Sequence, residues 1–100
     1  AHITGGGLTE NIIRVVPPGL GLRIDPMAWP RPALFDWLQR TGRIDDAEMW
    51  RTFNCGIGYV LLLPAAAEAP VRARLGAAGW DCWTIGAVED AGGGDRVRFA

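Results

Sequence analysis

An apolar run near the middle of the chain limits the folds open to this sequence more than any other feature. Residues 57–63 read Ile-Gly-Tyr-Val-Leu-Leu-Leu, with the turn-forming residues Asn54, Cys55 and Gly56 before them and Pro64 after them. A short run that is apolar on both faces and bounded by turn residues is typical of a central strand covered on both sides. Such a strand needs neighbouring strands and covering helices, so the sequence predicts a domain that combines helices with a sheet.

Other segments supply these partners. Apolar residues at helical spacing, bounded by proline and glycine, predict helices over residues 8–16, 32–41, 45–53 and 70–79. Alternating patterns predict strands over 20–24, 82–88 and 96–99, and glycines at 92–94 favour a loose hairpin turn between the last two. This order predicts an α/β (α+β) fold: a sandwich with a mixed sheet and an antiparallel edge hairpin, partly ferredoxin-like.

Within the predicted helices, single residues are expected to set the ends and the buried faces. Thr9 is placed to cap the first helix and Gly42 to end the second. Asp45 with Glu48 approximates a capping box for the third helix. The inner face of the second helix is predicted to carry four residues at helical spacing: Leu34, Trp37, Leu38 and Thr41.

Composition narrows the class of protein. The chain has 100 residues, enough for one domain, and Leu, Ile, Val and Phe supply 25 of them. That share exceeds the roughly 20% below which chains stay disordered, so we expect a packed core. The formal net charge of −1 gives no basic field for nucleic acid. The uninterrupted apolar run 60–63 is far shorter than the ~20 residues that a membrane-spanning helix needs. We therefore expect neither a nucleic acid nor a membrane partner.

The inventory of reactive side chains is small. All ten basic residues are arginine, so no lysine is available as a Schiff-base nucleophile or P-loop ligand. The two cysteines, Cys55 and Cys82, form no C-x-x-C motif, and His2 is the one histidine. We expect no metal site and two reduced, mostly buried thiols, although the count alone also allows a disulfide.

A glycine-rich segment near the start is the strongest candidate site. His2-Ile3-Thr4-Gly5-Gly6-Gly7 leads directly into the first predicted helix. Consecutive glycines let backbone N–H groups converge on an anion, and a helix N-terminus adds free donors. The segment matches neither the P-loop pattern nor G-x-G-x-x-G, and a flexible loop without a ligand explains it as well.

Two further candidates are less specific. His2 could act as a general acid or base or contact a phosphate, but it could equally have no role. Asn54 lies at a junction between a helix and the predicted central strand, where a crevice is common; Gly56 and Gly58 there could instead relieve packing. No base lies near Cys55 in the sequence, which argues against a cysteine nucleophile.

Several motifs together resemble one enzyme family. His2-Ile3-Thr4-Gly5-Gly6-Gly7 with Glu10-Asn11-Ile12 and Arg14-Val15 is similar to the glycine-rich signature in the C-terminal domain of the aminoimidazole ribonucleotide (AIR) synthetases, the phosphoribosylformylglycinamidine cyclo-ligases. The similarity continues through Phe35-x-Trp37-Leu38-Gln39, Glu48-Met49, Arg51-Thr52-Phe53-Asn54-Cys55-Gly56-Ile57-Gly58 and Ile85-Gly86, in the family's order and spacing. The departures are Ile13, where many members have proline, and Pro70 inside a helix.

The resemblance implies a fold and an activity. The fold would be a three-layer α/β/α unit, and residues 1–100 would be the distal part of the C-terminal domain, without the N-terminal ATP-binding domain and the start of the C-terminal one. The full-length enzyme would be a cytoplasmic homodimer of purine biosynthesis. It would use ATP and Mg²⁺, bound mainly by the N-terminal domain, to cyclise formylglycinamidine ribonucleotide to aminoimidazole ribonucleotide, releasing ADP and phosphate. This piece alone would bind no cofactor and be inactive.

The resemblance also implies roles for particular residues. The loop Thr4, Gly5, Gly6 and Gly7 would hold a phosphate, and His2 would lie at the cleft and assist proton transfer or phosphate stabilisation. Asn11 and Arg14 would brace the loop or reach the anion, and Asn54 would line the cleft from the neighbouring junction. The alternative function is a stand-alone, non-catalytic module that binds a small molecule or anion.

Overall fold

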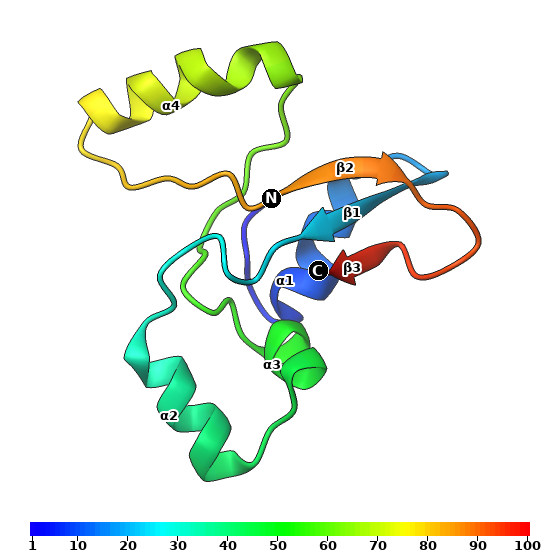
Figure 1. Cartoon of the computed structure of the whole chain (residues 1–100), viewed down its shortest axis with the longest axis vertical. Helices are drawn as coiled ribbons and strands as arrows, with labels where there is room; N and C mark the ends of the chain where they lie inside the picture. The colour runs from blue at the N-terminus through cyan, green and yellow to red at the C-terminus, as the bar shows by residue number, and fades with distance from the viewer.

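A three-stranded sheet and a short helical layer form the centre of the molecule. The computed structural model describes residues 1–100, and Figure 1 shows the arrangement. In chain order the elements are α1 (Gly7–Asn11), the 3₁₀ turn η1 (Ile12–Val15), β1 (Leu20–Ile24), α2 (Ala33–Gly42), α3 (Asp46–Thr52), the 3₁₀ turn η2 (Ala65–Ala67), α4 (Glu68–Ala77), β2 (Gly86–Asp90) and β3 (Val97–Phe99). The predicted α+β class and the mixed sheet are confirmed.

The sheet has the order β2-β1-β3. β1 pairs with β2 in antiparallel fashion and with β3 in parallel fashion, so that Leu22 lies opposite Val88 on one side and Val97 on the other. The predicted edge hairpin between the last two strands is therefore wrong. The glycine-rich segment 91–94 does not form a tight turn; it is part of a wide loop that carries the chain past β1 to its other edge (Figure 1).

Close backbone contacts and one arginine explain why β1 takes the central place. A Cβ at Gly21 would lie 2.5 Å from the Arg96 carbonyl oxygen, and one at Gly86 would overlap the Arg23 carbonyl. The Arg96 guanidinium also donates to the carbonyls of Leu20, Val16 and Pro17 at 2.9, 3.2 and 3.0 Å. The Gly86 contact brings β2 close to β1, and the Gly21 and Arg96 contacts bring the start of β3 close to it. None of these contacts is local in the sequence.

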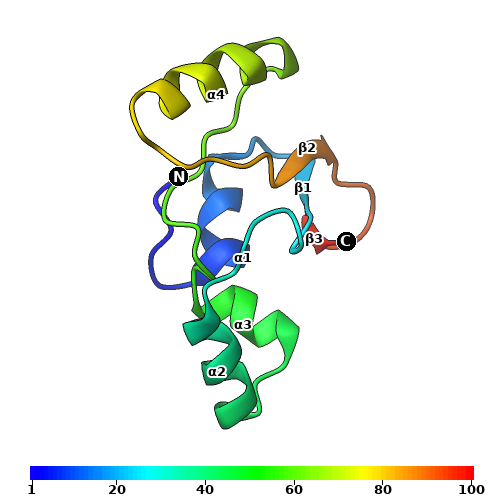
Figure 2. The same cartoon turned by 60° about the vertical axis from the view of Figure 1, so that its left-hand side comes forward.

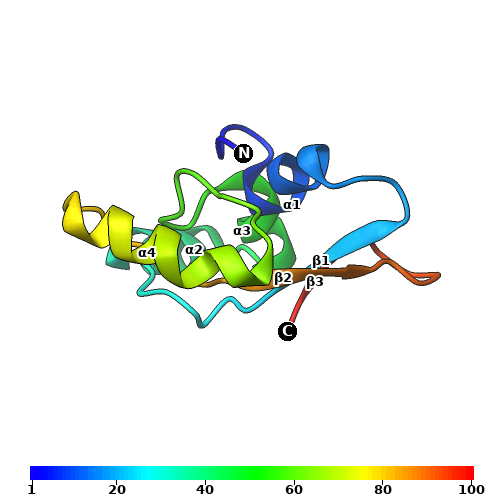
Figure 3. The same ribbon diagram turned by 90° about the horizontal axis from the view of Figure 1, so that it is seen from above.

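The core lies between the sheet and α1. Figure 3 looks across the sheet and shows α1 above it. Ten buried apolar residues form one cluster: Ile3, Leu8, Ile12, Val16, Leu22, Ile24, Trp29, Met49, Cys55 and Ile57. Alternate side chains of the sheet face the other way, where Arg23 and Arg98 both pair with Glu89. The sheet is therefore apolar on the face that α1 covers and charged on the other.

The apolar run 57–63 does not form the predicted central strand. It is extended, but its one ladder contact is an isolated antiparallel bridge between Tyr59 and His2. The reason is geometric: residues 1–3 are the only segment that pairs with it as a neighbouring strand would, through Ile3 to Gly58 and Ala1 to Val60. A ladder of that length cannot propagate.

The peripheral helices pack less than their patterns predict. In α2, Leu34 and Trp37 point outward and are more than half exposed, whereas Phe35 packs against the core. Gly42 is the last residue of α2, as predicted, but the left-handed C-cap conformation falls on the next residue, Arg43. α4 has no buried residue and projects away from the sheet (Figures 1 and 2). None of the helices combines the length and apolar character needed to cross a bilayer.

Two helix-start predictions have different outcomes. The Asp45 carboxylate accepts the Glu48 backbone N–H at 2.8 Å, which confirms it as the N-cap of α3. Thr9 does not cap α1, because the helix already begins at Gly7 with Gly6 in the cap position. The positive φ angles of Gly6 and Gly7, 98° and 59°, allow this earlier start.

The core assignment predicts a large difference between two leucines. Leu8 is fully buried and Leu34 is 60% exposed. We expect Leu8→Ala to lower the free energy of unfolding by about 2–5 kcal/mol, because it leaves a cavity, and Leu34→Ala to change it by less than about 0.5 kcal/mol. Urea denaturation of the two variants measures this difference, and equal costs would contradict the described core.

Candidate functional site

The structure brings the two candidate segments of the sequence together. Residues 3–7 lie beside residues 53–58, joined at one end by the Ile3 N–H, which donates to the Gly58 carbonyl at 2.9 Å. At the other end Gly7 meets the last turn of α3: a Cβ there would overlap the Trp50 carbonyl and lie 2.6 Å from that of Phe53. Only glycine fits this position, so the third glycine of the loop is required by packing as well as by its φ angle.

Asn11 organises the glycine loop from inside. Its side chain is buried, and its Nδ2 donates to the carbonyls of Thr4, Gly5 and Gly7 at 3.2, 3.2 and 2.8 Å. Its Oδ1 accepts the Thr4 hydroxyl at 3.2 Å. In this arrangement Asn11 braces the loop and its amide is fully engaged there.

The same arrangement leaves backbone donors of the loop free. The N–H groups of Gly5, Gly6, Leu8 and Thr9 donate to no acceptor in the chain, whereas the Gly7 N–H bonds back to the Thr4 carbonyl. A Cβ on Gly5 would meet nothing within 4 Å, which means that the loop is open at this point. Carbonyls turned inward and N–H groups without partners are the features that an anion-binding loop requires.

Two predicted ligands lie on the surface, one before and one after the loop in the sequence. The His2 ring is exposed and stacks on the Tyr59 ring, with 6.3 Å between centroids and 26° between planes. Arg14 is exposed on η1, and its guanidinium makes neither a hydrogen bond nor an ion pair. Both side chains are therefore accessible to a ligand.

Asn54 shapes the turn that faces the loop. Its Oδ1 accepts the Gly56 N–H at 2.7 Å, and its carbonyl accepts the Ile57 N–H at 3.0 Å. Cys55 and Gly56, at the two central positions, have φ angles of 52° and 101°, so the turn has two successive left-handed residues. Asn54 Nδ2 makes no hydrogen bond within the chain and is left as a donor.

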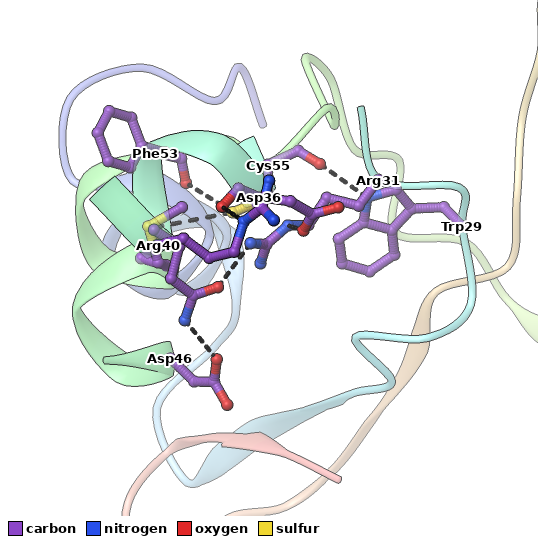
Figure 4. A network of polar contacts seen from close by, with 9 residues as sticks. Trp29, Arg31, Asp36, Arg40, Asp46, Phe53 and Cys55 are labelled. Atoms are coloured by element: carbon purple, nitrogen blue, oxygen red, sulfur yellow. Dashed lines mark hydrogen bonds and ion pairs between the residues drawn. The ribbon is translucent and has the colours of Figure 1, made fainter. Parts of the chain in front are cut away.

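A network missed by the sequence analysis holds this turn from behind (Figure 4). The Trp29 indole is buried and donates to the Cys55 carbonyl at 2.9 Å. Arg31 Nη2 donates to Gln39 at 2.6 Å, and Gln39 donates to Asp46 at 2.8 Å. The contact of Arg31 Nε with Asp36, at 2.9 Å, is an ion pair in which the N–H does not point along the line of contact.

No local pattern indicates this network. Met27–Pro32 has no periodicity and forms neither helix nor strand. One signal was present: a tryptophan and an arginine next to two prolines, which restrict the backbone of the segment.

Cys55 is a structural thiol. It is fully buried, its Sγ lies 3.8 Å from the Met49 carbonyl, and both cysteines are free, as expected. Burial raises the pKa of the Cys55 thiol, and the nearby Arg31 charge opposes that shift in part. The thiol is therefore protonated at neutral pH and unsuited to act as a nucleophile. No three His, Cys, Asp or Glu side chains are arranged to hold a metal ion.

Comparison with known proteins assigns the family. Residues 1–98 match the family described as "AIR synthase related protein, C-terminal domain". The chain belongs to this family. The resemblance inferred from the glycine loop and the Arg51–Gly58 block is thereby confirmed.

Named relatives come from the same family. The phosphoribosylformylglycinamidine cyclo-ligase of Xanthomonas oryzae pv. oryzae (strain PXO99A) is 60% identical over 99 residues, which are 99% of this chain and 29% of that protein. The proteins of the same name from Xanthomonas campestris pv. campestris (strain B100) and Xylella fastidiosa (strain Temecula1 / ATCC 700964) are 59% and 58% identical, with 29% and 28% of their lengths covered. The chain thus spans less than a third of the length of these relatives.

The bracing role of Asn11 predicts the effect of removing its donors. Asn11→Asp keeps the shape of the side chain but places a carboxylate oxygen against the carbonyls of Gly5 and Gly7. We expect the free energy of unfolding to fall by about 1–3 kcal/mol or more, because a charged group is buried without a donor. Thermal denaturation measures the loss, with Asn54→Asp as a control, because Asn54 is only partly buried and Asp keeps the oxygen that accepts the Gly56 N–H. An unchanged melting temperature at Asn11 would contradict the bracing role.

The burial of Cys55 predicts a reactivity difference between the two thiols. At pH 8, iodoacetamide is expected to label Cys82 at least about tenfold faster than Cys55, because burial shields one sulfur and raises its thiol pKa. The difference should vanish in denaturant. Mass spectrometry of the labelled peptides measures it, and equal native rates would show that Cys55 is accessible.

Proposed function

We propose that this domain serves an ATP-dependent cyclo-ligase by holding a phosphate group in the loop Thr4–Gly7. The full-length enzyme would convert formylglycinamidine ribonucleotide to aminoimidazole ribonucleotide in purine biosynthesis, with release of ADP and phosphate. Support comes from the cyclo-ligase name of relatives that are 58–60% identical over nearly the whole chain. The loop geometry supports the more specific role of this domain within that enzyme.

The single observation that carries the loop assignment is the set of unbonded N–H groups at Gly5, Gly6, Leu8 and Thr9. N–H groups without an acceptor inside the chain are free to donate to an external one, and those at the start of a helix also benefit from the positive end of its dipole. A phosphate offers several oxygens at once, and binding and charge stabilisation are the main tasks of a protein in phosphoryl transfer. The phosphate would be that of the ribonucleotide or the transferred group.

The side chains around the loop take complementary roles in this proposal. Arg14 carries an unpaired positive charge that a phosphate would neutralise, and Asn54 Nδ2 is a free donor on the facing turn. His2 would transfer a proton or stabilise the phosphate from the open side, beside Tyr59. Asn11 would act as a positioning residue, since its amide is used by the loop itself.

The cofactors are divided between this domain and the rest of the enzyme. The loop donors suit a phosphate group of ATP or substrate, but this chain has no set of three carboxylate, His or Cys side chains for Mg²⁺. Following the family resemblance, we propose that the N-terminal domain holds the Mg²⁺ ligands and most of the ATP site, in an enzyme that is a cytoplasmic homodimer. The 100-residue piece alone is then expected to bind no complete cofactor and to show no turnover.

Titration with inorganic phosphate tests the loop directly. In ¹H–¹⁵N spectra, the amide signals of Gly5, Gly6, Leu8 and Thr9 are expected to shift together and saturate, because each would donate to the same anion. The amide of Gly58, which lies outside the loop, serves as the internal reference. No shift in the loop amides at saturating phosphate would refute the loop assignment, whereas shifts without any ligase activity in the full-length protein would favour the non-catalytic anion-binding module.

A pair of glycine substitutions in the full-length enzyme separates the loop from general destabilisation. Gly6 has a φ angle of 98°, and a Cβ there would lie 2.7 Å from a Glu10 carboxylate oxygen, while Gly58 has open space and no positive φ angle. We expect Gly6→Val to raise the KM for the ribonucleotide or ATP by roughly tenfold, equivalent to about 1.4 kcal/mol of binding. Gly58→Ala should leave KM unchanged, and normal KM values in both variants would contradict the proposal.

A further inference from the structure

The segment Tyr59–Leu63 has the geometry of a strand without the hydrogen bonds of one. Its side chains alternate: Val60 and Leu62 pack against the core, while Tyr59, Leu61 and Leu63 are 67, 51 and 41% exposed. Alternation with a period of two is the pattern of extended backbone in a sheet. Here, however, both faces are apolar, so the outward face leaves three large apolar side chains in water.

The backbone of the same segment lacks partners. Neither the N–H nor the carbonyl of Leu61, Leu62 or Leu63 takes part in a hydrogen bond, although Val60 next to them is fully bonded. Unpaired groups along an extended apolar segment form an open edge, which readily accepts another strand. The backbone hydrogen bonds of a strand are therefore present at Val60 and missing from Leu61 to Leu63.

The start of the chain lies at that point and runs in the right direction. Ala1 and Val60 exchange two hydrogen bonds of 2.8 Å, and His2 lies opposite Tyr59 in an antiparallel bridge. In this register each step upstream from Ala1 corresponds to one step downstream from Val60. The first residue upstream of Ala1 falls opposite Leu61, the second opposite Leu62 and the third opposite Leu63.

We propose that, in a polypeptide as long as its relatives, the residues immediately upstream of Ala1 form a β-strand antiparallel to Leu61–Leu63. The chain covers only 29% of the length of a relative 60% identical to it, which leaves ample sequence for this strand. Hydrogen-bonded and non-bonded pairs alternate along an antiparallel ladder. Since Ala1 and Val60 form a bonded pair, the second upstream residue bonds to both groups of Leu62, and the first faces Leu61 without a bond.

This strand would lead directly into the candidate site. It continues into His2 and the glycine loop, and its pairing would fix the position at which His2 meets Tyr59. The inference does not depend on the proposed function, because it rests on register and unpaired backbone groups alone.

A cross-strand disulfide in the full-length protein tests the register. Non-bonded antiparallel pairs place their Cα atoms about 4.5 Å apart, within disulfide range. In a Cys82→Ser background, Leu61→Cys combined with cysteine at the first upstream position is expected to form a bridge within one polypeptide under mild oxidation. Leu62→Cys with the same upstream cysteine is the control and should form none, because the two side chains point to opposite faces.

Peptide mapping of the oxidised proteins gives the result. Absence of the Leu61 bridge, an equally efficient control bridge, or a bridge between two polypeptides would overturn the proposal; the last would indicate pairing with a second copy. Hydrogen exchange of the unsubstituted proteins gives an independent measurement. The Leu62 N–H is expected to exchange at least about 100-fold more slowly in the full-length protein than in the 100-residue chain, and equal rates would also overturn it.

Discussion

The amide side chain of Asn11 is the interaction on which the candidate site depends. Three loop carbonyls converge on its Nδ2, so the loop Thr4–Gly7 closes around a group that is itself buried in the core cluster. Turning the carbonyls inward is what leaves the loop N–H groups without internal acceptors. The buried Asn11 side chain thus links the packing of α1 to the orientation of the loop N–H groups. A substitution at Asn11 is expected to change both the stability of the fold and the shape of the loop.

Local signals in the sequence predicted local structure well. The positions of β1, α2 and α3 follow from alternation, a proline at a helix start and an Asp45 cap, all of which act within a few residues. The pairing of the strands was not predictable in this way, because it depends on Gly21 and Gly86 admitting distant backbone and on the Arg96 guanidinium reaching Val16 and Leu20. Those contacts span 60 or more residues, and no short pattern records them.

The candidate site shows the same division. The glycines identified the loop, the helix–strand junction identified Asn54, and the family resemblance identified Asn11. The different tasks of the two asparagines emerged only from geometry: Asn11 uses all of its amide inside the loop, whereas Asn54 keeps Nδ2 free. The role of Trp29 was not predictable because it supports the turn through a single hydrogen bond across 26 residues, and Arg31 bonds across 8 residues to Gln39 of α2. From sequence alone, a tryptophan in an irregular segment is interpreted as a core residue, and only the structure shows which acceptor its indole N–H bonds to.

Contacts around Cys55 explain why this non-glycine residue takes the left-handed conformation in the turn of residues 54–57. At Cys55 that conformation is disfavoured, and the cost is tolerated only where surrounding contacts fix it. Three such contacts are present: the Trp29 bond to its carbonyl, the burial of its side chain against the end of α3, and the Asn54 bond to the next N–H. Together these three contacts fix the turn in place beside residues 3–7.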